Sequence, residues 1–302
     1  MGLPLIDLTA APAQVARQID IALREVGFFC IVGHGVPQAV QAAAFSAGRR
    51  FFGLPLQAKE RWHINLSSHK RGYDPIGWQS LDPGQPPDVK ESFYMGRASH
   101  GPNPWPDVAL VPGFQAACEA YSNAMLTLAQ RLMGLFELAL DLPAGHFNTF
   151  MQDPTCTTRL LRYPPQPATP EPGQIGCGAH TDWGALTLLA QDDAGGLQVQ
   201  PPGQQQTGKW LDVPPHPGAL VVNVGDMMQR WTNDRWPSTL HRVINHHAGR
   251  DRQSIAYFFD LDGSAAIEPL AVCVDATHPA RYGPITAADH LQAMYRRTTV
   301  TA

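Results

Sequence analysis

The apolar positions in the first half of the chain recur at three- and four-residue spacing, which predicts helices. One such row covers Ala13–Val26, and a second starts near Pro37 and continues to about Phe52. The longest clean row spans Pro112–Leu140. Short apolar runs at Pro4–Leu8 and Phe28–Val32 are typical of strands. The first half is therefore expected to mix helices with a few strands.

The second half changes to short apolar or alternating runs separated by Gly, Pro, Asp and Asn. This spacing predicts an antiparallel sandwich or barrel. The clearest expected strands are Ala185–Ala190, Leu197–Gln200, Ala219–Val224 and Ser254–Phe259. A last helix is expected over Thr286–Arg296.

Three further segments have their own interpretations. Residues 67–112 are rich in Gly, Pro, Trp and His, lack clear periodicity, and are interpreted as long ordered loops. Gly195-Gly196 predicts a hairpin turn. The segment Asn223–Asp226 predicts a turn that opens the strand leading to His241, so Asp226 is interpreted as structural and not as a ligand. The pair His246–His247 is interpreted as a solvated turn, with a second metal site as the alternative.

Composition narrows the class of protein. The chain has 302 residues, is 44% apolar and 16% charged, and has a net charge of −4, which indicates no nucleic-acid or anionic-membrane footprint. Five cysteines without a CxxC pair favour reduced thiols in a cytoplasmic protein. The start of the chain lacks a basic segment and a long apolar run, so neither a signal peptide nor a membrane span is expected.

A possible metal site is indicated by the segment Gly178-Ala-His180-Thr-Asp182-Trp-Gly. His180 and Asp182 are two apart on an extended segment and would share a face. Together with His241, at the end of another expected strand, they would form a facial triad that leaves three positions of an octahedral iron open. By itself a His-x-Asp pair is also typical of a surface histidine that is hydrogen-bonded to a neighbouring aspartate.

A second pair gives this motif its context. Arg252 and Ser254 are also two apart on an expected strand and share a face. A guanidinium fork beside a hydroxyl suits one carboxylate end of a dicarboxylate. The alternative for Arg252 is an exposed strand charge paired with Asp251 or Asp260.

The ordered motifs resemble those of the isopenicillin N synthase-like superfamily of 2-oxoglutarate- and Fe(II)-dependent oxygenases. They cover nearly the whole chain. The series is Pro4-Leu-Ile-Asp-Leu, Gly27-Phe-Phe, Gly33-His-Gly-Val, Arg71-Gly-Tyr73, Lys90-Glu-Ser-Phe93, Gly101-Pro-Asn-Pro-Trp105, Arg159-Leu-Leu-Arg-Tyr163-Pro-Pro, Gly178–Gly184, Gly195-Gly-Leu197, Trp210, Asn223–Asp226, Ser238-Thr-Leu-His241 and Arg252-Gln-Ser254.

The resemblance implies a mixed α+β fold: a double-stranded β-helix (jelly roll) core with an N-terminal helical region and flanking helices. It divides the chain into an N-terminal α/β region with lid loops (1–112) and a long helix plus the jelly-roll oxygenase core (113–302), together one catalytic unit.

The resemblance also implies ligands. The iron would be held by His180, Asp182 and His241, and the distal carboxylate of 2-oxoglutarate by Arg252 and Ser254. Tyr163 matches a tyrosine that helps to bind this cosubstrate. Leu161 stands where many plant members have Asn, which is a departure from the family pattern. Arg159 faces the same way as Tyr163 and is a candidate anchor for cosubstrate or substrate, with a structural ion pair as the alternative.

Candidate substrate residues are aromatic. Tyr73, Trp78 and Phe93 stand in segments that the family uses as a lid, and Trp183 and Phe259 stand near the two motifs. Core packing is the alternative for each of them. Aromatic walls would favour an apolar or partly aromatic small molecule.

The implied reaction is a dioxygenase reaction that uses O2. A small-molecule metabolite is hydroxylated, desaturated or cyclised while 2-oxoglutarate yields succinate and CO2. Three alternatives stay open at this point: an ethylene- and succinate-forming enzyme, an oxidase that does not use 2-oxoglutarate, and a non-catalytic metal-binding protein. The chain is expected to work as a monomer or weak homo-oligomer.

Overall fold

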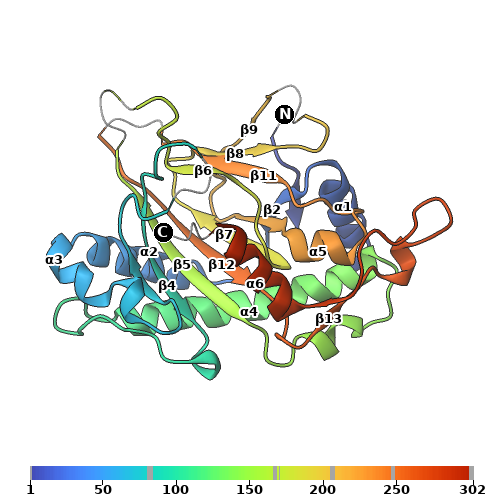
Figure 1. Cartoon of the computed structure of the whole chain (residues 1–302), viewed down its shortest axis with the longest axis horizontal. Helices are drawn as coiled ribbons and strands as arrows, with labels where there is room; N and C mark the ends of the chain where they lie inside the picture. The colour runs from blue at the N-terminus through green and yellow to red at the C-terminus, as the bar shows by residue number, and fades with distance from the viewer. Residues whose placement is uncertain are drawn as a thin grey trace.

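A computed structural model describes residues 2–79, 84–165, 169, 171–204, 208–245 and 249–298. The pair His246–His247 lies outside these residues. Figure 1 shows the smaller sheet above the larger sheet, and the longest helix below both.

The helices follow the predicted apolar rows closely. Pro12 occupies the first turn of the first helix, where its lack of an N–H does no harm, and the buried side chains of that helix recur at i, i+4 and i+7 from Val15. The described helices are α1 Pro12–Glu25, α2 Gln38–Phe52, α3 Leu56–Lys59, α4 Phe114–Ala139, α5 Asp226–Trp231 and α6 Ala287–Thr298. None of the helices in the described part of the chain is long and apolar enough to span a membrane.

The strands form two facing sheets and a small ribbon. Their bounds are β1 Leu5–Asp7, β2 Phe28–Val32, β3 Gly72–Asp74, β4 Glu91–Gly96, β5 Cys156–Tyr163, β6 Cys177–His180, β7 Leu186–Gln191, β8 Leu197–Gln200, β9 Leu211–Val213, β10 Leu220–Val224, β11 Leu240–Val243, β12 Arg252–Phe259, β13 Ala266–Ile267 and β14 Ile285–Thr286. Among the described residues, the larger sheet has the order β1-β2-β10-β7-β12-β5-β4-β3, the smaller has β6-β11-β8-β9, and β13 pairs with β14.

This arrangement is the mixed α+β, double-stranded β-helix fold that the sequence led us to expect. Among the strands of the described residues, all pairings are antiparallel except β1 with β2. The expected edge strand at Pro4–Leu8 is β1, at one end of the larger sheet. The larger sheet takes strands from both halves of the chain, so the two halves share one sheet.

Alternation along the strands of the larger sheet separates two cores. On β12, the side chains of Ile255, Tyr257 and Phe259 pack among the helices in what we call the helix-backed core. Ala256 packs between the sheets in the inter-sheet core, and Phe258 lies against it. Since side chains alternate between faces along a strand, each strand contributes to both cores.

Three expectations for loops and turns were wrong. Residues 67–112 contain two paired strands, β3 and β4. Asn223–Asp226 ends β10 and begins α5. Gly195-Gly196 is not a hairpin turn, because β7 and β8 belong to different sheets. The two glycines carry the chain across at positive φ, and a Cβ on Gly196 would collide with the Ile244 carbonyl oxygen.

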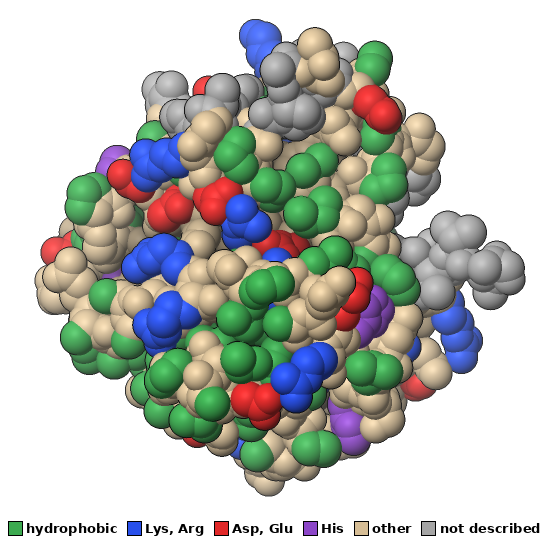
Figure 2. Space-filling view, turned by 90° about the vertical axis from the view of Figure 1, so that its left-hand side faces the viewer, with side chains coloured by type: hydrophobic (Ala, Val, Ile, Leu, Met, Phe, Trp, Pro, Cys, Tyr) green, Lys and Arg blue, Asp and Glu red, His purple; other side chains and the backbone are tan. Residues whose placement is uncertain are grey.

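Figure 2 shows Lys and Arg side chains interspersed with Asp and Glu on one face of the molecule. A mixed surface of this kind does not form the single-sign field that nucleic acid would require on that face.

The alternation of side chains between the two faces of β12 leads to a testable prediction about stability. Phe259 is fully buried in the helix-backed core, so Phe259→Ala should lower the free energy of unfolding by about 3–5 kcal/mol. The adjacent Phe258→Ala, at a half-buried position on the opposite face, should cost markedly less. Denaturant unfolding monitored by circular dichroism measures both, and equal losses would contradict the assigned faces.

Candidate active site

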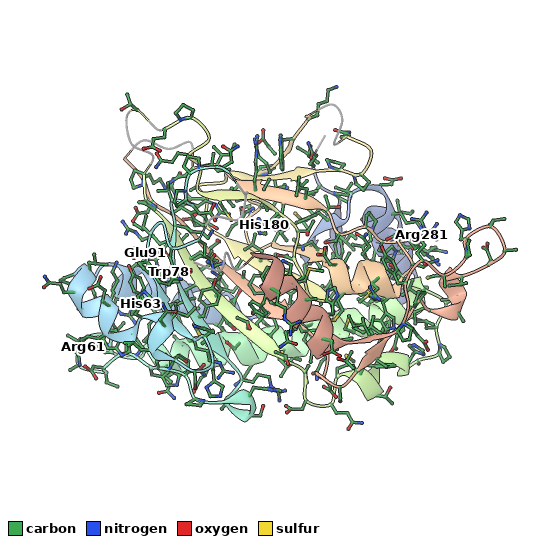
Figure 3. The ribbon with its side chains drawn as sticks, in the orientation of Figure 1. Arg61, His63, Trp78, Glu91, His180 and Arg281 are labelled. Carbon is green, nitrogen blue, oxygen red and sulfur yellow. The ribbon has the colours of Figure 1, made fainter. Side chains whose placement is uncertain are left out.

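His180, Asp182 and His241 meet between the two sheets. His180 ends β6, Asp182 follows in the next loop, and His241 lies on β11 directly opposite His180. Their possible ligand atoms all lie within 4.8 Å of one another. Asp182 and His241 are buried, with 7% and 8% of their surface exposed. Figure 3 shows His180 near the middle of the molecule, beneath the smaller sheet.

Backbone carbonyls orient both imidazoles in the same way. Nδ1 of His180 lies 2.8 Å from the Gly178 oxygen, and Nδ1 of His241 lies 3.1 Å from the Thr239 oxygen. Carbonyl oxygens only accept, so Nδ1 carries the proton and donates in each case. The lone pair of Nε2 is thereby left for another partner, as is usual for metal-binding histidines.

The Asp182 carboxylate is fixed through one oxygen. Oδ2 accepts hydrogen bonds from Thr187 Oγ1 and Asn223 Nδ2, both at 2.7 Å. The other oxygen, Oδ1, lies 3.8 Å from Nε2 of His241. Two neutral nitrogens and one carboxylate oxygen that face one another fit a divalent transition metal such as Fe(II).

The protonation states agree with this fit. Burial lowers the pKa of His241 to about 4, and the adjacent His180 acts in the same direction. Burial lowers the pKa of His180 as well. Burial alone would raise the pKa of Asp182, but the two imidazoles and the bonds from Asn223 and Thr187 leave it below its usual range. At neutral pH the imidazoles are neutral and the carboxylate is charged, which is the form that binds a metal.

Arg252 lies in the same pocket as the three metal-binding candidates. Its guanidinium donates to the Gly195 oxygen at 2.5 Å, to Ser254 Oγ at 3.1 Å and to Gln191 Oε1 at 3.3 Å. These three partners are neutral, although Arg252 is only 1% exposed. A buried cation held by neutral acceptors is prepared to bind an anion.

Tyr163 completes this end of the pocket. It pairs with Arg252 across β5 and β12, and the guanidinium carbon lies 4.7 Å from the centre of its ring. Tyr163 and Ser254 both line this pocket. The structure thus brings together the sequence-predicted set Arg252, Ser254 and Tyr163. Leu161, where the sequence departs from the plant pattern, lines the same pocket.

Arg159 lines the pocket and also forms an ion pair. It donates to Asp74 Oδ2 at 3.1 Å and to Gln79 Oε1 at 2.9 Å. Its guanidinium lies 4.4 Å from the centre of the Tyr94 ring and also contacts Ser92. Arg159 thus has a structural counter-ion and also faces the pocket, so the structure is compatible with either interpretation of this residue.

Three of the aromatic candidates are corrected by the structure. Tyr73, Phe93 and Phe259 belong to the helix-backed core and do not line the pocket. Among their neighbours on the opposite face, Phe258 of β12 lines the pocket, and Ser92 and Tyr94 of β4 contact the pocket residue Arg159. The error is one of parity, because a shift of one residue moves a side chain to the other face of the sheet.

The two tryptophan candidates lie elsewhere. Trp78 is 50% exposed and meets the edge of His63, with ring centres 4.7 Å apart. Figure 3 shows these two side chains together, away from His180. Trp183 is half-buried against Tyr295 of α6, at a ring distance of 4.9 Å. Neither is among the residues that line the pocket.

Sequence reasoning missed several residues that shape the site. Thr187 and Asn223 fix the Asp182 carboxylate. The alternation of faces along β7 and β10 could have indicated that these two side chains point toward the site. A buried pair, Lys90 with Asp88, holds the start of β6: Asp88 Oδ1 accepts from the Gly178 N–H at 2.8 Å. No motif at the sequence level indicates that contact.

Comparisons with known proteins agree with this geometry. Residues 3–108 match the family described as non-haem dioxygenase in morphine synthesis N-terminal, and residues 154–261 match the 2OG-Fe(II) oxygenase superfamily. A 2-oxoglutarate-Fe(II) type oxidoreductase of Emericella nidulans is 38% identical over 96% of this chain and 86% of its own length. A homoarginine-6-hydroxylase of Oryza sativa subsp. japonica is 34% identical over 92% and 87%.

A solved structure shows the same likeness. A full-length Neurospora crassa protein, crystallised in complex with alpha-KG and thymine, superposes with a TM-score of 0.87 at 28% identity. The match covers 98% of this chain and 97% of that one. The fold that places the three metal-binding candidates thus has an experimental counterpart in a cosubstrate complex.

The hydrogen bond from Thr187 gives a prediction for metal binding. Thr187→Val keeps the shape but removes one donor to Asp182 Oδ2, so the carboxylate becomes less well oriented. We expect the apparent affinity of the apo-protein for Mn(II) to fall about 10- to 100-fold, as for other groups that orient metal ligands. Isothermal titration calorimetry measures it. The matched control is Thr127→Val on the exposed side of α4, and an equal loss in both variants would contradict the assigned role.

Proposed function

Because the chain belongs to the 2OG-Fe(II) oxygenase superfamily, we propose that His180, Asp182 and His241 hold Fe(II) while the enzyme oxidises a small organic molecule. The protein is a 2-oxoglutarate- and Fe(II)-dependent dioxygenase. The alternatives that lacked 2-oxoglutarate or lacked catalysis are therefore set aside. The ligand assignment rests on one observation: Nε2 of His180, Nε2 of His241 and Oδ1 of Asp182 face one another.

We assign the distal carboxylate of 2-oxoglutarate to Arg252 and Ser254, with Tyr163 beside them. This rests on a buried guanidinium whose protein partners are neutral. A carboxylate would supply the missing counter-charge and accept from both the fork and the hydroxyl. When bound, Fe(II) and 2-oxoglutarate supply the oxidising chemistry, with O2 as co-reactant and succinate and CO2 as products.

The side chains between the two anchors serve a different purpose. Leu161, Leu189 and Val243 line the pocket that also contains Arg252 and His241. Apolar walls exclude water and strengthen the interaction between the guanidinium and an anionic cosubstrate. The protein thus orients the cosubstrate and keeps the site dry.

Arg159 is proposed as an anchor for substrate rather than for 2-oxoglutarate. On β5 it lies four residues from Tyr163, which pairs with Arg252, while Arg159 pairs with Ala256. Four residues of a strand span about 13 Å, so the two arginines enter the pocket from well-separated points of its wall. Because Asp74 already balances its charge, Arg159 can donate hydrogen bonds to a carbonyl or carboxylate oxygen of the substrate.

Other parts of the proposal follow from the surroundings. Phe258 and Phe28 line the pocket and offer apolar contact to the substrate. Trp183, next to Asp182, and Trp78 are proposed to contact the outer part of a bound molecule.

Five unpaired cysteines among the described residues support a reducing compartment such as the cytoplasm. We retain the proposal of a monomer or weak homo-oligomer.

The cosubstrate assignment predicts the behaviour of Arg252→Lys. A lysine keeps the charge but loses the fork, so the affinity for 2-oxoglutarate should fall about 10- to 100-fold, the worth of one charge-assisted hydrogen bond. Anaerobic titration of the Fe(II)-protein with 2-oxoglutarate, followed by its weak visible absorption band, measures this. The control is Arg242→Lys on β11, whose guanidinium contacts Gln198 and Trp210. An unchanged affinity in Arg252→Lys would remove the assignment.

Turnover tests the reaction itself. With Fe(II), 2-oxoglutarate and a metabolite panel that includes thymine and homoarginine, we expect succinate release that depends on one of the panel compounds. Mass spectrometry identifies the product as hydroxylated, desaturated or cyclised. His180→Ala should abolish succinate release. Ethylene in the headspace would instead favour the ethylene-forming alternative, and full activity of His180→Ala would overturn the iron assignment.

A further inference from the structure

The two peptide groups that follow Asp182 are held by segments from distant parts of the chain. The Asp182 carbonyl oxygen accepts from the N–H of Asp226 at 2.8 Å, at the start of α5. The Trp183 carbonyl oxygen accepts from the N–H of Met227 at 3.1 Å and lies 3.0 Å from Nε2 of His290 on α6. The backbone beside a candidate metal ligand is therefore fixed by two helices.

His290 makes this contact from a buried position. It is only 5% exposed although it lies on a helix near the end of the described chain. The Trp183 carbonyl oxygen can only accept, so Nε2 of His290 carries the proton and donates. The two residues are 107 positions apart, so this contact is a long-range one.

The N-terminal end of α6 is itself firmly attached. The N–H groups of Ala287 and Ala288 donate to the carbonyl oxygens of Ala265 and Gly263, both at 2.9 Å. Thr286 Oγ1 accepts from the Asp289 N–H at 3.1 Å, which caps the first turn. Since His290 follows directly, its ring is presented by a rigid support and not by a fraying end.

A second contact from α6 reaches the same residue. The Tyr295 ring meets the Trp183 ring edge-on, at 4.9 Å and 81°. Trp183 is thus held at its backbone by His290 and at its side chain by Tyr295. Figure 1 shows α6 in front of β7 and β12, the strands of the larger sheet that pass beneath the site.

We propose that His290 is a positioning residue for the iron site, because its hydrogen bond to the Trp183 carbonyl fixes the peptide between Trp183 and Gly184 and thereby the short loop that orients the Asp182 carboxylate. The inference rests on the proposed iron ligands. Without this bond, the Met227 N–H is the one hydrogen-bond partner that the described residues leave to the Trp183 carbonyl, and the peptide between Trp183 and Gly184 gains freedom to rotate. Small rotations there displace Oδ1 of Asp182 from the two Nε2 atoms, which weakens metal binding before any substrate is involved.

Two substitutions separate the hydrogen bond from the bulk of the side chain. His290→Gln places an amide N–H at about the reach of Nε2, whereas His290→Asn is too short to reach the Trp183 oxygen. We expect His290→Asn to weaken Mn(II) binding by the apo-protein about three- to tenfold, less than loss of a direct partner of a ligand, and His290→Gln to recover most of it. Calorimetric titration gives the affinities, and thermal unfolding is recorded for each variant.

The matched control is Gln292→Ala, an exposed position two residues further along α6. It should bind Mn(II) like the parent protein. Mn(II) affinity in His290→Asn equal to that of the parent, or an equal loss in the Asn, Gln and control variants, would overturn the proposal. A parent protein whose Mn(II) binding does not depend on His180 would instead overturn the proposed iron ligands, so the two failures are distinguishable.

A measurement on the unmodified chain keeps the test independent of how the variants fold. Coupling between two sites is reciprocal, so metal that binds at His180, Asp182 and His241 must also stabilise α6 if His290 supports them. Hydrogen–deuterium exchange of the apo-protein with and without Mn(II) should show slower exchange in residues 287–296 as well as in residues 181–185. Unchanged exchange in α6 beside protected ligands would contradict the inference.

Discussion

The pleat of the larger sheet is the constraint on which the rest of the structure depends. Its central strands are covered on one face by helices and on the other by the smaller sheet. Every second residue must therefore suit an apolar core, while the residues between them are free to carry chemistry. On β12 this gives Ile255, Tyr257 and Phe259 to the core and Arg252 and Ser254 to the site. A single strand thus supplies stability and function without conflict.

The same periodicity decides how much was predictable. Arg252 and Ser254 are two apart on β12, so their shared face followed from spacing alone. The long apolar rows located α1, α2 and α4 to within two residues at every end. Phe259 was assigned to the wrong face although the Arg252 register, extended in steps of two, indicates Phe258. The alternation of side chains along β12 can be derived from the sequence, and it decides which of the two adjacent phenylalanines faces the pocket.

Other parts of the fold could not be predicted from local sequence patterns. β3 and β4 are short, and their alternate residues are polar groups such as Asp74 and Ser92 that pair with Arg159 across the sheet. A polar residue that is buried by a partner 85 positions away is indistinguishable in sequence from an exposed one. α5 follows a strand without an apolar row of its own and is fixed by contacts of its N–H groups to the loop after β6.

Charge balance gives the two buried arginines of the pocket different roles. Removing a guanidinium from water is costly unless an anion or several acceptors compensate it. Arg159 has a carboxylate partner within the protein, Asp74, and so can tolerate a neutral ligand. Arg252 has only neutral partners in its three hydrogen bonds and therefore gains most from an anionic one. The proposed separation of cosubstrate from substrate thus rests on which cation the fold has already neutralised.

A short His-x-Asp motif carries little weight alone for a different reason. Asp182 lies in a loop, where the pleat no longer fixes its direction. Hydrogen bonds from Thr187 and Asn223 to its carboxylate, and from two helices to its loop, hold it opposite the imidazoles.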